Sequence, residues 1–291
     1  MLYFVIGFLR VAVFVLFRSI IWKKCMKYKA IKIIAIVLSA ILGLCVGSFL
    51  NVVIYRLPNG MNLAKPASHC PKCNNPIKWY DNIPVLSYLI LGGKCRHCKE
   101  HISIRYTIVE LLNALLWVGS VLMFWSRNIP YTITVCIACS ILICIFFIDL
   151  EHMIIPDSLQ LCLLACAIAM LFTEWDPDNT WDVKLYGLLV CGGLFVVIHY
   201  GALILFKKEA IGGGDVKLFA ILGLMLGLSN SILMLIISTV LASIVLLLVK
   251  VIKKFNKDKE YPFAPFIVIA AIISIFFGYY IVTGYLDLIR F

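Results

Sequence analysis

The sequence predicts an all-α polytopic membrane protein with about eight transmembrane helices. Of its 291 residues, 63% are hydrophobic and only 14% are charged. Soluble domains are closer to half apolar and a quarter charged, so this composition excludes a soluble, disordered or coiled-coil protein. The apolar residues also form a series of runs, each comparable to the roughly 20 residues that a helix needs to cross a bilayer.

Eight such runs follow one another along the chain, and the fourth and sixth are short. They cover residues 33–54, 106–125, 131–148, 158–173, 185–206, 216–229, 231–249 and 264–285. Gly223 and Gly227 in the sixth run predict close packing against a neighbouring helix, because glycine lets two backbones approach. The runs leave one polar stretch of domain-like length, residues 55–105.

The net charge of +11 indicates how the helices are oriented. Lysine and arginine are concentrated in three polar segments, and an eight-helix topology puts all three on one side: 55–105, 207–215 and 250–262. Basic loops stay in the cytoplasm, so we assign this side as cytoplasmic. The positive charge therefore needs no nucleic-acid partner.

Residues 1–30 fit this topology less well, because five lysines between Lys23 and Lys32 fall on the opposite side. Arg10 and Arg18 interrupt the preceding apolar stretch, which lacks the charged start of a signal peptide. A ninth span would invert every later loop. We interpret residues 1–30 as an N-terminal extension, either an interfacial helix or the result of an alternative start at Met26.

Two cysteine pairs in the polar stretch have the spacing C-x2-C-x21-C-x2-C, which is typical of a tetrahedral zinc site. The predicted ligands are Cys70, Cys73, Cys95 and Cys98. Such a closed site would stabilise the loop without taking part in chemistry. The alternative is four free or redox-active cysteines. The other eight cysteines are predicted to act as small hydrophobic residues, and the nearby histidines to be solvated.

Two acidic residues are predicted at membrane depth, where ionisable groups are costly and indicate function. Asp149 ends the third run and Asp215 begins the sixth, so the topology brings both to the cytoplasmic level. The run Gly212–Gly214 can let another chain approach closely and can adopt positive φ. Paired carboxylates can share one proton and so perform aspartic-protease chemistry. The structural alternatives are a helix end and an N-cap.

Other polar residues give weaker signals. Asp157 is predicted to be an N-cap. Glu151 is a candidate contact for substrate, and Lys217 could stabilise an ionised carboxylate pair or reach the headgroups. Glu110 lies inside the second run and is unexplained unless it has a partner or lines a cavity. Asn51 is expected to hydrogen-bond across helices.

The motifs resemble those of the type IV prepilin peptidase family, in the family's order, from about Gly43 to Gly227. They are Gly47-Ser48-Phe49-Leu50-Asn51-Val52, Arg56-Leu57-Pro58, the two cysteine pairs, Ile77–Tyr88 between them, Ile102–Tyr106 with Val109-Glu110, Asp149 with Ile155-Pro156-Asp157, and Gly212-Gly213-Gly214-Asp215-Val216-Lys217.

The resemblance implies a membrane aspartic endopeptidase that removes the leader peptide of type IV prepilins or pseudopilins at the cytoplasmic face of the bacterial inner membrane. Asp149 and Asp215 match the family's catalytic pair. Members that carry the cysteine loop also N-methylate the new N-terminus with S-adenosylmethionine, but no glycine-rich fingerprint indicates where that donor binds. The implied organisation is an extension over 1–30, a first span with the cysteine loop over 31–105, and a seven-helix peptidase domain over 106–291.

Two other functions remain open from the residues alone. An ion-coupled transporter could use Asp149 and Asp215 as a proton or cation relay, although such transporters show internal symmetry that the sequence lacks. A zinc-bearing membrane scaffold without activity would tolerate changes at both aspartates but not the loss of its cysteines.

Overall fold

The protein was analysed as a computed structural model that describes residues 2–65, 67–70, 72–207, 212–252 and 261–289, with the backbone alone for 2–28, 206 and 252. The described residues form nine α-helices and one short 3-10 helix. The helices are α1 (Leu2–Arg56), η1 (Trp79–Asn82), α2 (Leu86–Ile90), α3 (Arg105–Phe124), α4 (Ile129–His152), α5 (Asp157–Thr173), α6 (Trp181–Phe206), α7 (Gly213–Leu226), α8 (Leu228–Ile252) and α9 (Ala264–Ile289).

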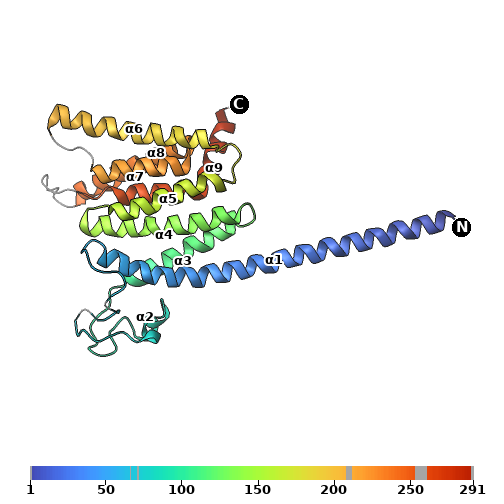
Figure 1. The fold of residues 1–291 in the computed structure, drawn as a ribbon, viewed down its shortest axis with the longest axis horizontal. Coiled ribbons are helices and arrows are strands. Elements are labelled where there is room, and N and C mark those ends of the chain that lie inside the picture. Colours follow the sequence, from blue (N-terminus) through green and yellow to red (C-terminus); the bar gives the residue numbers. More distant parts are fainter. Residues whose placement is uncertain (1, 66, 71, 208–211, 253–260, 290–291) are drawn as a thin grey trace.

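The long helices lie side by side and alternate in direction, with α1 at one edge of the bundle and α6 at the other (Figure 1). Helix α4 is the most buried of the long helices and packs against α1, α3, α5 and α9. It ends where α5, α7 and α9 begin, and we call this the Asp149 end of the bundle. The cysteine-rich loop (residues 57–104) is attached at the same end, between α1 and α3.

Within the described residues, six helices are long and apolar enough to cross a membrane: α1 over Lys29–Arg56, α3, α4, α6, α8 and α9. The eight apolar helices that the sequence predicts are all present, but α5 has 17 residues and α7 only 14. At about 1.5 Å per residue, α7 is shorter than a hydrocarbon core of about 30 Å. The all-α architecture is confirmed, with six helices rather than eight meeting the length of a span.

Glycines bring helices into backbone contact, as the sequence predicts for Gly223. A Cβ atom on Gly223 would collide with the carbonyl oxygen of Gly187, so α6 and α7 cross at these two glycines. Gly227 lies in the one-residue connection between α7 and α8 and has a φ of +77°. Only glycine adopts this conformation easily, and a side chain there would overlap Asn179.

Polar side chains join α1, α3 and α4 inside the bundle. The amide of Asn113 donates to the carbonyl of Gly43 (2.7 Å) and accepts from the hydroxyl of Ser140 (2.7 Å). The predicted cross-helix hydrogen bond of Asn51 is confirmed, because its amide donates to the carbonyl of Tyr106 (3.0 Å). These bonds fix α4, and with it Asp149, against the first two spans.

Helix α1 continues without a break from Leu2 into the first span (Figure 1). The side chains of residues 1–28 lie outside those described, so the interfacial position of residues 1–30 stays a prediction. Lys32 is described, and its ammonium reaches the carbonyl of Leu122 (3.4 Å) and the hydroxyl of Ser126 (3.3 Å). Leu122 lies in the last turn of α3 and Ser126 just beyond it, so Lys32 is opposite the Asp149 end, as the topology predicts.

Candidate active site and cysteine cluster

Asp149 lies in the last turn of α4, with its side chain almost fully buried. Its carboxylate accepts a hydrogen bond from the backbone N–H of Ala264 (3.1 Å), the first residue of α9. Helix α4 ends three residues later, where Met153 takes a left-handed φ of 54° and donates to the carbonyl of Asp149 (3.0 Å). The carboxylate is therefore held between the end of one helix and the start of another.

Asp215 is the third residue of α7, half-buried, and its carboxylate is close enough to Asp149 for the two charges to interact. The positive φ expected at the glycine run is wrong: Gly212 has a φ of −59°, and Gly213 and Gly214 already belong to the helix. The glycines permit close packing instead. A Cβ atom on Gly214 would lie 3.3 Å from that of Ile155, in the α4–α5 connection.

Gln160 joins these two segments and was not singled out by the sequence. It lies in the first turn of α5 with 3% of its surface exposed. Its amide donates to the carbonyl of Gly214 (3.3 Å) and to that of Ile155 (3.4 Å), while its own oxygen is buried without a partner. The available signal was a polar residue at the start of an apolar helix, three residues after Asp157.

The ion pairs at this end revise the roles expected for three residues. Asp157 is not an N-cap; it is the first residue of α5, and its carboxylate pairs with the ammonium of Lys217 (2.7 Å). Lys217 therefore reaches another acid rather than Asp215. Glu151 pairs with Arg105, at the start of α3. Both pairs tie helices together around Asp149 and Asp215, with Glu151 and Lys217 beside the site.

Glu110, unexplained in the sequence, has a partner. It is buried in the second turn of α3, and its carboxylate accepts the backbone N–H of Val85 (2.7 Å) in the cysteine-rich loop. Val85 has a φ of +61°, a genuine outlier for a β-branched residue. The N–H of Leu86 donates a hydrogen bond to the carbonyl of Pro84 (2.6 Å), so Val85 is the central residue of a strained γ-turn. Glu110 thus fastens the loop to the bundle at its tightest turn.

The four predicted metal ligands come together in the loop. The sulfur atoms of Cys70, Cys73, Cys95 and Cys98 all lie within 4.8 Å of one another, and those of Cys70 and Cys98 are 3.8 Å apart. A tetrahedral zinc with bonds of about 2.3 Å places its sulfurs about 3.8 Å apart. The donor set and its spacing fit zinc, and the group contains no histidine.

The two cysteine pairs have matching backbones. The N–H of Cys70 bonds the carbonyl of Asn75, and the N–H of Cys95 bonds that of Glu100. The residue after the second cysteine of each pair has left-handed φ, 56° at Asn74 and 60° at Lys99. N–H groups of Cys98 and His97 lower the pKa of the Cys95 thiol to about 7, which favours the thiolate that binds metal.

The remaining described cysteines match the expected role of small hydrophobic residues. Five are buried within the bundle, and two lie exposed on helices that face outward. The buried ones are Cys136, Cys139, Cys144, Cys166 and Cys191. Cys25 lies outside the residues whose side chains are described.

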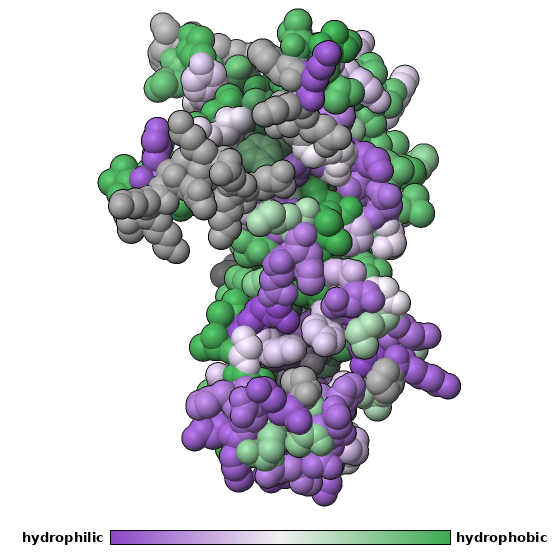
Figure 2. Space-filling view, turned by 90° about the vertical axis from the view of Figure 1, so that its left-hand side faces the viewer, coloured by the Kyte–Doolittle hydropathy of each residue, from purple (hydrophilic) through white to green (hydrophobic). Residues whose placement is uncertain are grey.

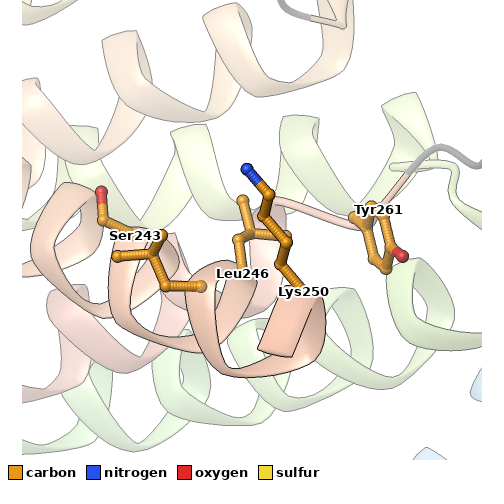
Figure 3. Close-up of a pocket in the computed structure, with 5 residues that line it drawn as sticks. Ser243, Leu246, Lys250 and Tyr261 are labelled. Atoms are coloured by element: carbon orange, nitrogen blue, oxygen red, sulfur yellow. The ribbon is translucent and has the colours of Figure 1, made fainter. Parts of the chain in front are cut away.

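A hollow of about 430 Å³ lies near the end of α8, lined by Ser243, Leu246, Leu247, Lys250 and Tyr261 (Figure 3). Among the described residues, its lining includes no carboxylate for the ammonium and sulfonium groups of S-adenosylmethionine. These lining residues by themselves do not fit that donor.

Two family models match consecutive parts of the chain. Residues 41–124 match the bacterial peptidase A24 N-terminal domain, and residues 136–247 match the type IV leader peptidase family. The chain belongs to the type IV leader peptidase family. The first match contains the cysteine-rich loop with all four clustered cysteines, and the second contains both Asp149 and Asp215.

Relatives in the leader peptidase family resemble the chain over most of its length. The prepilin leader peptidase/N-methyltransferase of Legionella pneumophila is 34% identical in an alignment that covers 84% of this chain and 92% of the relative. The protein of the same name from Myxococcus xanthus is 41% identical over 63% of this chain and 53% of the relative. No solved structure matches the chain.

A third relative carries a different description. The type 4 prepilin-like proteins leader peptide-processing enzyme of Escherichia coli O78:H11 is 38% identical over 66% of this chain and 77% of the relative. The predicted family and enzyme class, a membrane leader peptidase/N-methyltransferase, are confirmed. The comparisons do not support the transporter or the inactive scaffold.

Proposed function

We propose that the chain cleaves the leader peptide of type IV prepilins or pseudopilins with Asp149 and Asp215 as its catalytic pair, and that it then N-methylates the new N-terminus. The observation that supports the pair is its geometry. Two carboxylates from two different helices meet at one end of the bundle, close enough for their charges to interact.

The hydrogen bond from Ala264 supports an assignment of the base and the acid in the carboxylate pair. An acceptor at a helix N-terminus is stabilised in its charged form, so Asp149 is proposed as the base and Asp215 as the acid. Asp149 takes a proton from water, whose oxygen attacks the scissile carbonyl carbon while Asp215 donates a proton to the carbonyl oxygen. Collapse of the intermediate breaks the C–N bond, the leaving nitrogen takes the proton held by Asp149, and Asp215 recovers its proton from a hydroxyl of the new carboxyl group.

The proposed substrate reaches the pair along the glycine run. A prepilin has an apolar helix that can lie in the bilayer beside the bundle, with its basic leader on the cytoplasmic side of the membrane. The peptide to be cut must be extended, and Gly212 and Gly213 are exposed and carry no side chain that would exclude it. Glu151 and Lys217 flank this run, so a passing leader would meet the ion pairs that they form with Arg105 and Asp157.

The proposed setting is the bacterial cytoplasmic (inner) membrane, with the Asp149 end and the cysteine-rich loop on the cytoplasmic side. The basic segments around this end support that orientation. We further propose that α5 and α7 complete an eight-helix membrane domain as short helices. Neighbouring helices bury most of α7 and one face of α5, so these two helices need not match the bilayer thickness by themselves.

The four cysteines are proposed to hold a structural zinc ion, which leaves no open position for a substrate. When bound, S-adenosylmethionine would supply the methyl group for the new amine. Members named as N-methyltransferases support this second activity.

The aspartate pair is tested by Asp149→Asn and Asp215→Asn in purified enzyme incubated with a prepilin and the methyl donor, followed by mass measurement of the product. Each variant should lose processing by at least about a thousandfold, because neither amide can exchange a proton. Asp157→Asn is the matched control, since Asp157 is an acid at the same end with a different partner, and should retain most of the activity.

The same assay separates the two activities, because cleavage without a gain of one methyl mass would leave a peptidase alone. Substantial cleavage by either Asp149→Asn or Asp215→Asn would refute the proposed pair. Loss of cleavage in Asp157→Asn to the same degree would show that the assay reports damage to the whole end of the bundle.

A further inference from the structure

Helix α2, in the cysteine-rich loop, has an apolar face with no protein partner among the described residues. Leu86, Leu89 and Ile90 are 50%, 68% and 70% exposed, and their spacing of three and four residues puts them on one side of the helix. Ser87, on the other side, is buried, and its hydroxyl bonds the carbonyl of Ile83. A short helix in water would not be expected to present its largest aliphatic side chains outward.

This face lies level with a membrane-spanning helix. The N–H of Val85, immediately before α2, bonds Glu110 (2.7 Å), which is five residues into α3 and therefore about 7.5 Å along it. In Figure 1, α2 lies on the side of the loop that faces the middle of the bundle, not the outer end. The apolar face therefore continues the exposed surface of α3, where Ile108, Leu111 and Leu115 also point outward.

The opposite surface of the loop is polar. Figure 2 views the molecule from the Asp149 end, and its lower part, formed by the cysteine-rich loop, is mostly hydrophilic. The loop thus has a polar surface towards the end of the bundle and an apolar helix towards its middle. This distribution is typical of a structure that lies in the membrane interface.

Several contacts make the loop a rigid support for α2. Arg96, which follows Cys95, forms a bidentate ion pair with Asp81 in η1 (2.6 and 2.8 Å). Arg96 and Lys78 both lie over the ring of Tyr80, 5.6 Å from its centre. Beyond α2, the carbonyl of Gly93 accepts the N–H of Ile102 (2.8 Å). The helix cannot withdraw its apolar face without disturbing these bonds.

We propose that Leu86, Leu89 and Ile90 insert into the cytoplasmic leaflet beside α3, so that the bilayer covers the apolar face of α2. The basic residues next to it, Lys78, Lys94 and Arg96, would then lie at the level of anionic lipid headgroups. The four-cysteine cluster is consequently held at the membrane surface rather than free in the cytoplasm. This inference concerns lipid contact and does not depend on the proposed catalytic pair.

The test measures lipid contact directly with a tryptophan placed on the face. Leu89→Trp is reconstituted in vesicles of phosphatidylcholine and phosphatidylglycerol, with and without bromine on the acyl chains. Its fluorescence is compared with that of the parent protein, which supplies the signal of the native tryptophans. Lys65→Trp, at an exposed position elsewhere in the loop, is the matched control.

The emission added at residue 89 should be largely lost in brominated vesicles and unaffected by aqueous iodide. The emission added at residue 65 should show the opposite pattern. If iodide quenches residue 89 as strongly as residue 65, the face is open to water and the proposal is wrong. Protection from both quenchers would mean that a protein surface covers α2, which also overturns it.

Ile90→Trp repeats the test on the same face if Leu89→Trp does not accumulate as folded protein. The zinc content of each variant shows whether the loop has kept its structure. If residue 89 is exposed to water while prepilin cleavage is normal, membrane insertion is refuted and the proposed function is not affected. If Asp157→Asn loses cleavage as the catalytic variants do, only the proposed function is affected.

Discussion

The side-chain amide of Gln160 donates a hydrogen bond to the carbonyl of Gly214 (3.3 Å), the residue immediately before Asp215. The same amide reaches the carbonyl of Ile155 (3.4 Å), in the connection that follows α4. One buried side chain therefore links the segments that carry the two candidate catalytic acids. Its oxygen has no hydrogen-bond partner among the described residues, so Gln160 fixes these segments while leaving one polar atom unsatisfied.

Replacing Gln160 by methionine should lower activity without lowering stability. Methionine has a similar volume but cannot donate to Gly214, so the spacing between Asp149 and Asp215 becomes less well fixed. A lost hydrogen bond of about 1 kcal/mol corresponds to roughly a fivefold fall in kcat, with little change in KM. Because methionine also removes an unsatisfied buried oxygen, the midpoint of thermal unfolding should stay the same or rise.

Gln160→Glu provides the control for this interpretation. It keeps the size of the side chain but replaces the donating amide by a carboxyl group beside two carbonyl oxygens, so it should lose both activity and stability. If Gln160→Met instead lowered the unfolding midpoint and left kcat unchanged, Gln160 would have a structural role only.

The sequence predicted the parts of this site that depend on residue type and spacing. Metal chemistry makes the four cysteines in two C-x2-C pairs recognisable as ligands. Carboxylate chemistry does the same for the two acids at the ends of apolar runs. The eight apolar helices were located within a few residues for most of their ends, because long hydrophobic runs are strong signals. The helix lengths were harder to predict: α7 ends at Leu226, because Gly227 has a φ of +77° and turns the chain into α8.

The partners of the polar residues could not be predicted, because each lies in a segment distant along the chain. Glu110 is 25 residues from Val85, and Asp149 is 115 residues from Ala264. Gln160 gave only a weak signal, as one of several polar residues at the start of an apolar helix. The glycine run illustrates a second limit: its composition allows positive φ, but in the structure Gly214 is helical and packs closely against Ile155.

The end of the bundle opposite Asp149 is held by a buried ion pair. The ammonium of Lys184, fully buried, lies 2.6 Å from the carboxylate of Glu174 and 2.8 Å from the carbonyl of Met170. Lys184→Met should destabilise the protein by about 3 kcal/mol, because Glu174 is left without its cation. Thermal unfolding in detergent measures the effect, and cleavage by the remaining folded enzyme should be normal.

The double variant Lys184→Met with Glu174→Gln distinguishes this explanation from a simple packing defect. It removes both charges, so it should recover much of the stability that the single variant loses. Asp178→Asn, an exposed acid in the same connection, should change the midpoint very little. Equal destabilisation in the single and double variants would contradict the role of the unpaired charge.

Metal binding by the four cysteines should depend on pH. Zinc binds thiolates, so protons compete with it and affinity falls as pH falls. The pKa of Cys95, lowered to about 7 by the N–H groups of Cys98 and His97, makes this thiol available at neutral pH. Purified protein should contain about one zinc per chain at pH 8 and lose it to a chelator faster at pH 6, as measured by metal analysis.

Cys70→Ser combined with Cys95→Ser should abolish zinc binding, because two of the four thiolates are lost. Cys162→Ser, at an exposed cysteine of α5, should leave the zinc content unchanged. Full zinc occupancy in the double variant would show that the metal is bound elsewhere.

Glu110 should hold the cysteine-rich loop against the bundle through the N–H of Val85. Glu110→Leu removes the acceptor and leaves that N–H without its partner, at a cost of about 1–3 kcal/mol. Hydrogen exchange at the amides of Val85 and α2 should therefore quicken roughly tenfold or more, while exchange in α4 stays slow. Glu110→Gln keeps an oxygen acceptor and should retain most of the protection. Unchanged exchange in Glu110→Leu would mean that the γ-turn at Val85 is maintained by its own loop, and that Glu110 does not fasten it.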